Sequence, residues 1–487
     1  MKLLLSSVNR NRSIYSAYAV LVLLFLSNIM SGNSSGNPPK RILPNIIVIL
    51  IDDAGYADFG FMGNKDLLTP NIDKLAAQSM RFTDAHVTAS VCSPSRAGLL
   101  TGKYQQRFGY ECNEGEGYSG LDPAQILLPK LLQNQGYTTA AFGKWHLGFE
   151  QGQDPLQKGF QYFYGFLSGS RSYFYQKDKD DQPGEKRALF ENKQQVKFEG
   201  YLTDVLGNKA VDYIKQHKHH PFFMYWAPNA VHTPMEASKA DLEKFPGHPR
   251  QKLAAMTYSL DRSIGKIVEA LKQQGLLENT LIFFLSDNGG AHNNQSSNFP
   301  LKGFKGNKYE GGQRVPFLVS WPRQITSGAD FKGLASSLDI FPTALEAAGI
   351  KINTSYGLDG VDLLPFLKNK KNKKNENPHE QLIWRKDAMA AIRFNQYKLI
   401  RVRGLGERLY DLDKDPGETT DLSSQQPAIF SALKRQLVLW EKDKMNPIWT
   451  EGAIWDTITL MIHDDLMNNR KVRVQNPEEL EKFRVTK

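Results

Sequence analysis

Five short apolar runs, separated by longer segments with helical spacing, constrain the fold of this chain more than any other feature. After Asn45, the segment 45–51 is continuously apolar and rich in β-branched side chains, which is typical of a strand buried on both faces of a parallel sheet. Similar runs follow at 138–142, 222–226, 281–286 and 315–321. Helical patterns lie between them at 69–79, 203–215 and 251–274, and another follows the last run at 338–348. This alternation predicts an α/β fold in which helices sandwich a large, mostly parallel sheet.

A change in composition near Leu367 divides the chain. Residues 368–378 are polar, basic and rich in turn-forming residues, which indicates a solvated linker rather than a nucleic-acid-binding patch. Beyond it lie two strand patterns that form a hairpin, a third strand and a helix, at 389–394, 397–402, 409–412 and 428–442. We therefore expect a large α/β domain over 42–366. A smaller C-terminal α+β subdomain, a four-stranded type of sheet with one helix and a tail, is expected over 379–487.

The N-terminus has the pattern of a secretory signal peptide. Lys2, Arg10 and Arg12 precede the apolar residues 17–26, and small residues follow between positions 31 and 35. The apolar run is too short to span a bilayer comfortably, although an uncleaved anchor is the alternative. We expect residues 1–32 to be removed on export. The mature protein would then be secreted or periplasmic in a bacterium, with no stable membrane insertion.

Charge and cysteine content narrow the partners and the compartment. The formal net charge of +10 favours a polyanionic partner, and the sequence has no nucleic-acid-binding motif, so a sulfated or phosphorylated substrate is the better interpretation. The two cysteines, Cys92 and Cys112, could form one disulfide, but chemical consumption of Cys92 would leave Cys112 unpaired. So low a cysteine count fits a bacterial periplasm better than an animal lysosome.

Two pairs of oxygen-bearing side chains follow predicted strands. Asp52 and Asp53 come after the first strand, and Asp287 and Asn288 come after the fourth. Ligands of α/β proteins gather at the carboxyl ends of such strands, so we expect these side chains to meet. An all-oxygen set suits calcium or magnesium rather than zinc. The alternative is that strand-end aspartates only cap the turns that follow them.

The most specific motif is the pentapeptide at 92–96, Cys-Ser-Pro-Ser-Arg, followed by Thr101 and Gly102. It resembles the C-x-P-S-R signature of the type I sulfatase family, within the alkaline phosphatase superfamily. Other elements similar to this family follow in the family's order, from about Pro44 to about Trp440. They are G-K-W-H-L-G at 143–148, H-x-P at 232–234, S-D-N-G at 286–289 and K-G-x-x-x-E-G-G-x-R-x-P at 305–316.

The resemblance implies an alkaline phosphatase-like fold and a sulfuric ester hydrolase, with the large domain as the catalytic sulfatase domain. It implies that a maturation enzyme oxidises Cys92 to formylglycine (3-oxoalanine). It also implies a bound cation, calcium with magnesium as the alternative. The expected metal ligands are Asp52, Asp53, Asp287, Asn288 and the modified Cys92.

The same resemblance implies a role for each matched basic residue. The hydrated aldehyde would attack sulfur and form a covalent sulfated intermediate, with Arg96 and the cation making its hydroxyl more acidic. Lys144 would bridge this group and the sulfate. His232 or Lys305 would protonate the departing oxygen, and His146 would take the proton from the second hydroxyl as sulfate leaves.

An aromatic stretch at 159–176 offers a substrate pocket. Its rings surround Ser170, Arg171 and Tyr173, so we expect stacking on sugar rings and a second anionic group held by Arg171. The alternative is ordinary core plus loop. Bacterial relatives with this layout mostly act on polysaccharide sulfates, so the expected substrate is a sulfated carbohydrate, either a polysaccharide or an oligosaccharide.

Three other functions stay open at this point. They are a broad arylsulfatase, a phosphonate or phosphate monoester hydrolase of the same superfamily, and a catalytically silent glycan-binding protein. The last would be expected to lack Cys92, Arg96 or Lys144, and all three are present. Three histidines outside the motifs receive no role, His86, His292 and His463. Asp339 is interpreted as a helix cap.

Overall fold

The computed structural model describes residues 43–368 and 377–485. The predicted signal peptide, 1–32, lies outside the described residues, and so does most of the predicted linker at 368–378. Every helix within the described ranges is too short or too polar to cross a membrane.

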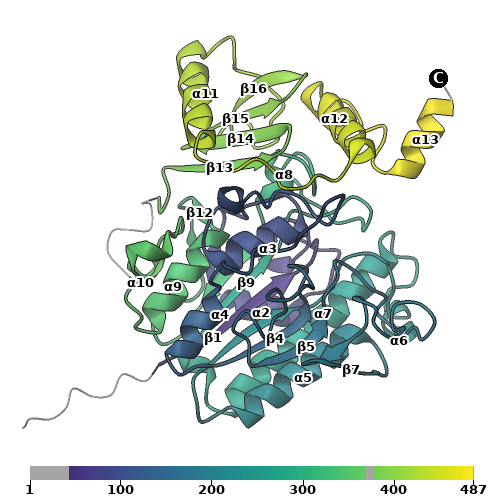
Figure 1. Ribbon diagram of the computed structural model, residues 1–487, viewed down its shortest axis with the longest axis vertical. Coiled ribbons are helices and arrows are strands. Elements are labelled where there is room, and N and C mark those ends of the chain that lie inside the picture. Colours follow the sequence, from purple (N-terminus) through teal and green to yellow (C-terminus); the bar gives the residue numbers. More distant parts are fainter. Residues whose placement is uncertain (1–42, 369–376, 486–487) are drawn as a thin grey trace, which may run out of the picture. The chain divides into compact units, whose positions relative to one another are not determined.

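A ten-stranded sheet forms the centre of the α/β part (Figure 1). Five neighbouring strands run parallel in the order β9-β1-β8-β4-β5. They are β9 (Thr280–Ser286), β1 (Asn45–Ile51), β8 (Phe222–Ala227), β4 (Thr138–Lys144) and β5 (Tyr162–Phe166). The fifth predicted strand is β10 (Phe317–Ser320), which extends the sheet beside β9 in the antiparallel direction. The prediction of a large, mostly parallel sheet is confirmed.

The remaining strands are short and lie at the sheet's margins or apart from it. On the β10 side the sheet ends with β2 (Met80–Phe82) and β11 (Ala329–Phe331), and on the β5 side with β6 (Phe190–Glu191) and β7 (Gln194–Gln195). A separate two-stranded sheet pairs β3 (Ala85–His86) with β12 (Ala335–Ser336). The five parallel strands, rather than these short ones, therefore position the side chains at the sheet's carboxyl edge.

Side chains of β1 alternate between two separate hydrophobic cores. Ile46, Val48 and Leu50 belong to one core, and Ile47, Ile49 and Ile51 belong to the other. The first core includes residues of α3 (Cys92–Thr101), α4 (Leu128–Asn134) and α9 (Ile340–Ala347). The second includes residues of α2 (Pro70–Ala77), α5 (Leu202–Gln216) and α7 (Gln251–Gln273). Because helices cover both faces, the strand is continuously apolar rather than alternating.

Asp339 does cap a helix, as expected. Its carboxylate and the Ser336 side chain form a capping box at η4 (Ser337–Asp339), which leads directly into α9. The other carboxylate oxygen of Asp339 lies 2.7 Å from Nε2 of His379, at the start of the C-terminal part. One buried carboxylate therefore begins a helix and also anchors the chain that follows.

The C-terminal part contains a four-stranded antiparallel sheet in the order β13-β14-β15-β16. Its strands are β13 (Gln381–Lys386), β14 (Met389–Phe394), β15 (Tyr397–Val402) and β16 (Gly406–Asp411). Helix α11 (Pro427–Glu441) packs on one face through Leu433 and Leu437. The other face packs on Tyr309 and Leu334 and on the end of α12 (Ala453–Met467), which is followed by α13 (Pro477–Val485).

Buried ion pairs join this small sheet to the α/β part. Lys398 of β15 lies 2.8 Å from Glu310 and 3.2 Å from Glu418, and all three side chains are fully buried. Glu310 also contacts His86 at 2.9 Å, so that histidine has a structural partner. Because a buried charge is tolerated only when it is paired, these contacts fix where the small sheet lies.

Candidate active site

Adjacent parallel strands bring the predicted site residues to one edge of the large sheet. Asp52 and Asp53 follow β1, Asp287 follows β9, and Lys144 is the last residue of β4. His232 lies in the segment after β8. Parallel strands end at a common edge, so residues that are far apart in sequence meet there.

Helix α3 brings Cys92 to the same place. Cys92 is the first residue of the helix and is buried, and its Sγ lies 3.6 Å from Oδ1 of Asp52 and 3.7 Å from Oδ1 of Asp53. The helix ends at Gly102, whose φ of +66° is readily adopted by glycine and whose N–H donates to the carbonyl of Gly98. Because Cys92 is the first residue of α3 and lies beside Asp52 and Asp53, the N-terminus of the helix, which is the positive end of its dipole, faces the two carboxylates.

Arg96 and Lys144 form a buried cationic pair beside these carboxylates. Arg96 donates from Nε to Oδ2 of Asp287 at 2.9 Å and from Nη1 to the Lys144 carbonyl at 2.9 Å. The Lys144 ammonium lies 2.8 and 3.0 Å from the two carboxylate oxygens of Asp52. Both cations are positioned by their partners, so they are pre-organised to face an anionic group.

Lys305 and His232 approach the same oxygen of Asp53. The Lys305 ammonium lies 2.8 Å from Oδ2 of Asp53, and Nε2 of His232 lies 3.5 Å from it. Burial alone would raise the pKa of Asp53, but Lys305 and His232 outweigh it and hold that pKa below its usual value. Burial would lower the pKa of Lys305, and Asp53 raises it well above the usual value, so Lys305 is protonated.

One group of potential metal ligands lies at this edge. Asp52, Asp53, Cys92 and His232 each offer an atom, and these atoms all lie within 4.8 Å of one another. In a formylglycine residue an oxygen would replace Sγ, so Sγ marks where an oxygen ligand would lie. Within the described part of the chain, Asp287 is outside this group and pairs with Arg96 instead.

The residues at this edge fit a hard divalent cation. Asn288 is buried, and its Oδ1 has no hydrogen-bond partner among the described residues, although its Nδ2 donates to Asp53 at 2.8 Å. Burial, followed by repulsion from Asp52, raises the pKa of Asp287 to about 6. A free amide oxygen, and a carboxylate whose pKa stays raised although Arg96 lies beside it, both favour calcium or magnesium.

His146 faces the site as a neutral imidazole. Its φ of +60° is unusual for a residue with a side chain, and such strain is common at functional sites. A Cβ at Gly169 would come within 2.6 Å of the ring, so glycine is needed to make room for it. Burial first, and then Lys144, holds the pKa of His146 well below 6.5, which leaves the ring able to accept a proton.

Comparison with known proteins identifies the family. The sequence profile described as "Sulfatase" matches residues 44–350, and the profile of the C-terminal part of N-sulphoglucosamine sulphohydrolase matches residues 304–443. The chain belongs to the sulfatase family. It is therefore a sulfuric ester hydrolase, as the motifs predicted.

Relatives of this sulfatase span most of its length. N-acetylgalactosamine-6-sulfatase of Homo sapiens is 35% identical over 355 residues, which cover 69% of this chain and 67% of the relative. Arylsulfatase J of Mus musculus is 32% identical over 462 residues, which cover 82% of this chain and 76% of the relative.

Solved structures also resemble this chain over most of its length. Ps i-CgsB is 36% identical with a TM-score of 0.80, covering 88% of this chain and 99% of that chain. It has also been solved in complex with k-i-k-neocarrahexaose. Phosphonate monoester hydrolase of Agrobacterium radiobacter, at 20% identity and a TM-score of 0.60, shares only the fold, over 81% of the sulfatase and 95% of its own chain.

The structure contradicts two of the three predicted substrate contacts of this sulfatase, Arg171 and Tyr173. Arg171 is 1% exposed, and its guanidinium pairs with Asp181 at 2.8 Å, so it is not free to hold an anion. Tyr173 is fully buried and donates to the carbonyls of Asn229 and His232. Ser170 is half-buried. The alternative of ordinary core holds for much of the aromatic stretch, because Tyr173 and several of its neighbours belong to the second hydrophobic core.

Two residues that were not predicted from the sequence support the site. Asn294 is buried and donates to the backbone carbonyls of Asp53 and Val231, and Ser93 donates to the carbonyl of His146 at 2.6 Å. Ser93 lies within the pentapeptide, and that position is a sequence signal that could have identified it as a site residue. Asn294 carries no comparable signal, because its partners are backbone atoms brought close only by the fold.

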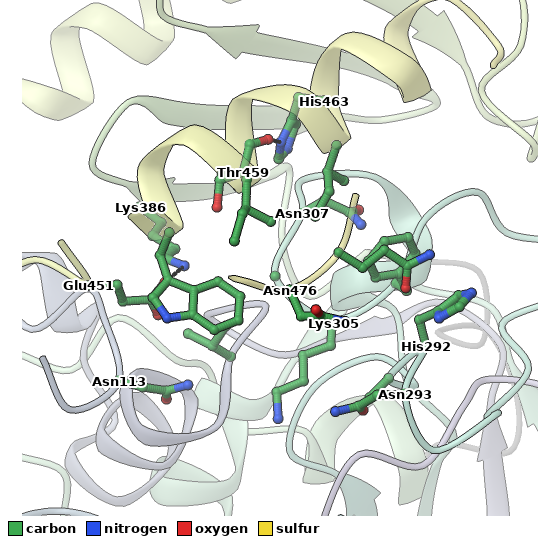
Figure 2. Close-up of a pocket in the computed structure, with 18 of the residues that line it drawn as sticks. Asn113, His292, Asn293, Lys305, Asn307, Lys386, Glu451, Thr459, His463 and Asn476 are labelled. Atoms are coloured by element: carbon green, nitrogen blue, oxygen red, sulfur yellow. Dashed lines mark hydrogen bonds and ion pairs between the residues drawn. The ribbon is translucent and has the colours of Figure 1, made fainter. Parts of the chain in front are cut away.

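A cavity of about 520 Å³ adjoins Lys305 and was also missed. Figure 2 shows Lys305, Asn113 and Asn293 on one side of it and Thr459 and His463 of α12 on the other. The volume is typical of a small-molecule pocket. The residues of α12 contain no motif that marks this helix as the cover of a site.

Proposed function

We propose that this sulfatase removes a sulfate ester from a carbohydrate, using formylglycine made from Cys92 and a bound calcium ion. The observation that carries the proposal is the position of Sγ of Cys92, within 3.7 Å of two carboxylates at the carboxyl edge of the sheet. The nearby cavity beside Lys305 offers room for the sugar. The carbohydrate assignment is supported by Ps i-CgsB, which is 36% identical to this chain and has been solved in complex with k-i-k-neocarrahexaose.

Asp52, Asp53, Asp287 and Asn288, with the modified residue 92, would hold the cation. When bound, calcium would supply positive charge where the sulfate oxygens and the attacking oxygen gather negative charge. Magnesium is the alternative ion for this donor set.

The residues around position 92 would orient the sulfate group. Formylglycine in its hydrated form would supply the hydroxyl that attacks sulfur. Arg96 and Lys144 are fully buried and held by carboxylates, so they would stabilise charge on the sulfate without having to reorganise. This arrangement favours an anionic group bound in a fixed orientation.

Proton transfer would be divided between two sides of the site. His232 or Lys305 would give a proton to the sugar oxygen as its bond to sulfur breaks. His146, which is neutral, would later take a proton from residue 92 as sulfate departs. Lys305 lines the cavity where the sugar would lie, so it is placed for the first of these proton transfers. The second proton transfer is therefore assigned to His146.

Release of inorganic sulfate from defined substrates tests the proposal. Protein produced together with a formylglycine-generating enzyme should release sulfate from sulfated oligosaccharides. It should act far less on the matching phosphate and phosphonate monoesters. Hydrolysis of aryl sulfates, with no hydrolysis of any sulfated saccharide, would favour a broad arylsulfatase. Faster hydrolysis of phosphonate monoesters than of sulfate esters would favour a phosphonate or phosphate monoester hydrolase. Capture of a sulfated glycan without turnover would favour the silent glycan-binding alternative.

Three further expectations from the sequence belong to the same proposal. They are export by a cleaved signal peptide to the periplasm or the exterior, maturation by a partner enzyme, and no binding of nucleic acid. Mass measurement of the exported protein would show whether residues 1–32 have been removed.

A further inference from the structure

Helix α12 forms one wall of the cavity beside Lys305. We call this cavity the vestibule and define it by Asn113, Lys305, Asn307, Lys386, Trp455 and His463. The two matching family profiles end at residues 350 and 443, so α12 (Ala453–Met467) lies beyond both. The wall supplied by α12 is therefore a feature of this chain rather than of the profiles.

His463 lines the vestibule and carries a hydrogen-bond acceptor that has no partner among the described residues. The residue is fully buried, and its Nδ1 lies 2.7 Å from the carbonyl oxygen of Thr459. A carbonyl only accepts, so Nδ1 carries the hydrogen, and burial lowers the pKa of His463 to about 4, which leaves Nε2 unprotonated. Within the described chain Nε2 has no partner. A buried acceptor of this kind needs an O–H or N–H group, which a ligand in the vestibule or an ordered water supplies.

Asn307 presents the complementary donor. It is 1% exposed, and its Oδ1 accepts from the N–H of Tyr309 at 3.2 Å. Its Nδ2 has no hydrogen-bond partner within residues 43–368 and 377–485. A hydroxyl group both donates and accepts, so hydroxyls of one ligand can satisfy Asn307 and His463 together.

Trp455 adds an apolar surface to the same wall. Its side chain lines the vestibule and is 40% exposed, which is high for a tryptophan. Large aromatic rings are normally buried, and an exposed one beside unsatisfied polar atoms is typical of a binding surface. A sugar ring combines an apolar C–H face with hydroxyls on its edge, which matches this combination.

The charges of the vestibule are already compensated. Lys305 pairs with Asp53 at 2.8 Å, and Lys386 pairs with Glu451 at 2.6 Å. Both described lysines of the lining are thus engaged, while Glu114 and Glu479 add negative charge. A second sulfate or a carboxylate would find no unpaired lysine among the described residues of this lining. It would also be unable to donate a hydrogen bond to His463, because an ionised sulfate only accepts.

These observations point to one substrate class for the vestibule, and the inference rests on the proposed carbohydrate sulfatase activity. We infer that α12, through Trp455 and His463, is a specificity element that binds the sugar carrying the scissile sulfate. That sugar has free hydroxyls and no second anionic group. The enzyme would therefore act on sparsely sulfated saccharides, and a further sulfate on the same ring would hinder it.

Matched substrates and variants test this inference. The probes are 4-nitrophenyl sulfate and a positional series of monosulfated galactose and N-acetylgalactosamine saccharides, each with a counterpart that carries a second sulfate on the same ring. The variants are Trp455→Ala, Trp455→Phe and His463→Phe, with Ile454→Ala as the control. Ile454 is on the same helix and is 53% exposed, but it is not part of the described vestibule lining.

For Trp455→Ala and His463→Phe, the ratio of kcat/KM on the best monosaccharide sulfate to kcat/KM on nitrophenyl sulfate should fall about tenfold or more, since each loses a direct contact with the sugar. Trp455→Phe should recover most of that ratio, and Ile454→Ala should match the unchanged protein. Disulfated counterparts should be poorer substrates. A ratio that stays unchanged, including one in which kcat/KM falls equally on both substrates, would overturn the inference. So would a preference for the disulfated ring. Hydrolysis of nitrophenyl sulfate with no sulfate released from any saccharide would instead refute the carbohydrate proposal on which it rests.

Discussion

The ammonium group of Lys305 lies 2.8 Å from Oδ2 of Asp53, which joins the lining of the vestibule to the carboxyl edge of the large sheet. The two residues are 252 positions apart in sequence. Lys305 is the more exposed of the pair, with 18% of its side chain accessible against 2% for Asp53. One side chain thus faces both the predicted metal site and the space where the leaving sugar would lie.

Removing Lys305 should slow hydrolysis in a way that depends on the leaving group. If Lys305 gives the proton to the departing oxygen, Lys305→Ala should lower kcat/KM about 100-fold or more for an alkyl or sugar sulfate. The loss should be much smaller for nitrophenyl sulfate, whose phenolate leaves readily without a proton. Measuring kcat/KM over leaving groups of graded acidity gives the comparison.

The same series distinguishes Lys305 from His232, which also lies near Asp53. The residue whose loss makes the rate depend more steeply on leaving-group acidity is the proton donor. If neither Lys305→Ala nor His232→Ala changes that slope, the departing oxygen does not lie where these residues meet.

Loss of His146 should affect a later step. Without a base for the second hydroxyl, His146→Ala should still release nitrophenol in a first turnover and then accumulate protein that carries one sulfo group. Burst kinetics combined with intact-protein mass spectrometry would show both effects. His219→Ala, a substitution at an exposed histidine, serves as the control. Accumulation in His232→Ala but not in His146→Ala would mean that the two roles are reversed.

Removal of the cation should abolish activity and lower stability together. Chelation should inactivate the enzyme, and calcium should restore it and raise the unfolding midpoint, since a ligand bound only by the folded state stabilises by about 2.7 kcal/mol at 100-fold excess over Kd. Asp53→Asn should lose the calcium-dependent shift of the midpoint. Asp330→Asn, which alters a half-exposed surface pair with Arg81, should keep it. An active enzyme free of divalent metal would contradict the proposed site.

The pair of His379 and Asp339 should make stability depend on pH. Burial would lower the pKa of His379, but Asp339, 2.7 Å away, outweighs it and raises that pKa above 6.5. The pair therefore stabilises the fold fully below about pH 6.5 and loses this contribution as pH rises through the raised pKa. The unfolding midpoint of His379→Gln should fall below that of the unchanged protein more at about pH 5.5 than at about pH 8.5. Equal differences at both pH values would show that the ion pair contributes nothing.

Much of the fold and of the proposed site was predictable because both depend on local pattern. Asn45–Ile51 is buried on both faces by the helices around it, which is why its continuous apolar run indicated a central parallel strand. Asp52 and Asp53 follow that strand directly, so their place at the sheet edge was predictable too. Cys92 was predictable from a motif of five consecutive residues.

What could not be predicted depends on contacts between distant segments. Arg171 looks like a ligand-binding residue until the fold brings Asp181 against it. His463 showed no motif. Its significance depends on Thr459 engaging one ring nitrogen, on the other nitrogen having no partner in the described chain, and on a cavity completed by residues more than a hundred positions earlier. The sequence order of α12 contains no sign of which surface the helix covers.

The account depends most directly on the chemical state of residue 92. Peptide mass spectrometry of active protein, with the fraction of aldehyde at residue 92 compared with the rate of sulfate release across samples of differing maturation, tests it. We predict that activity rises in proportion to the aldehyde fraction and that Cys92→Ser, made with only a cysteine-specific maturation enzyme, is inactive. Full activity in protein whose Cys92 is an unmodified thiol would contradict the account.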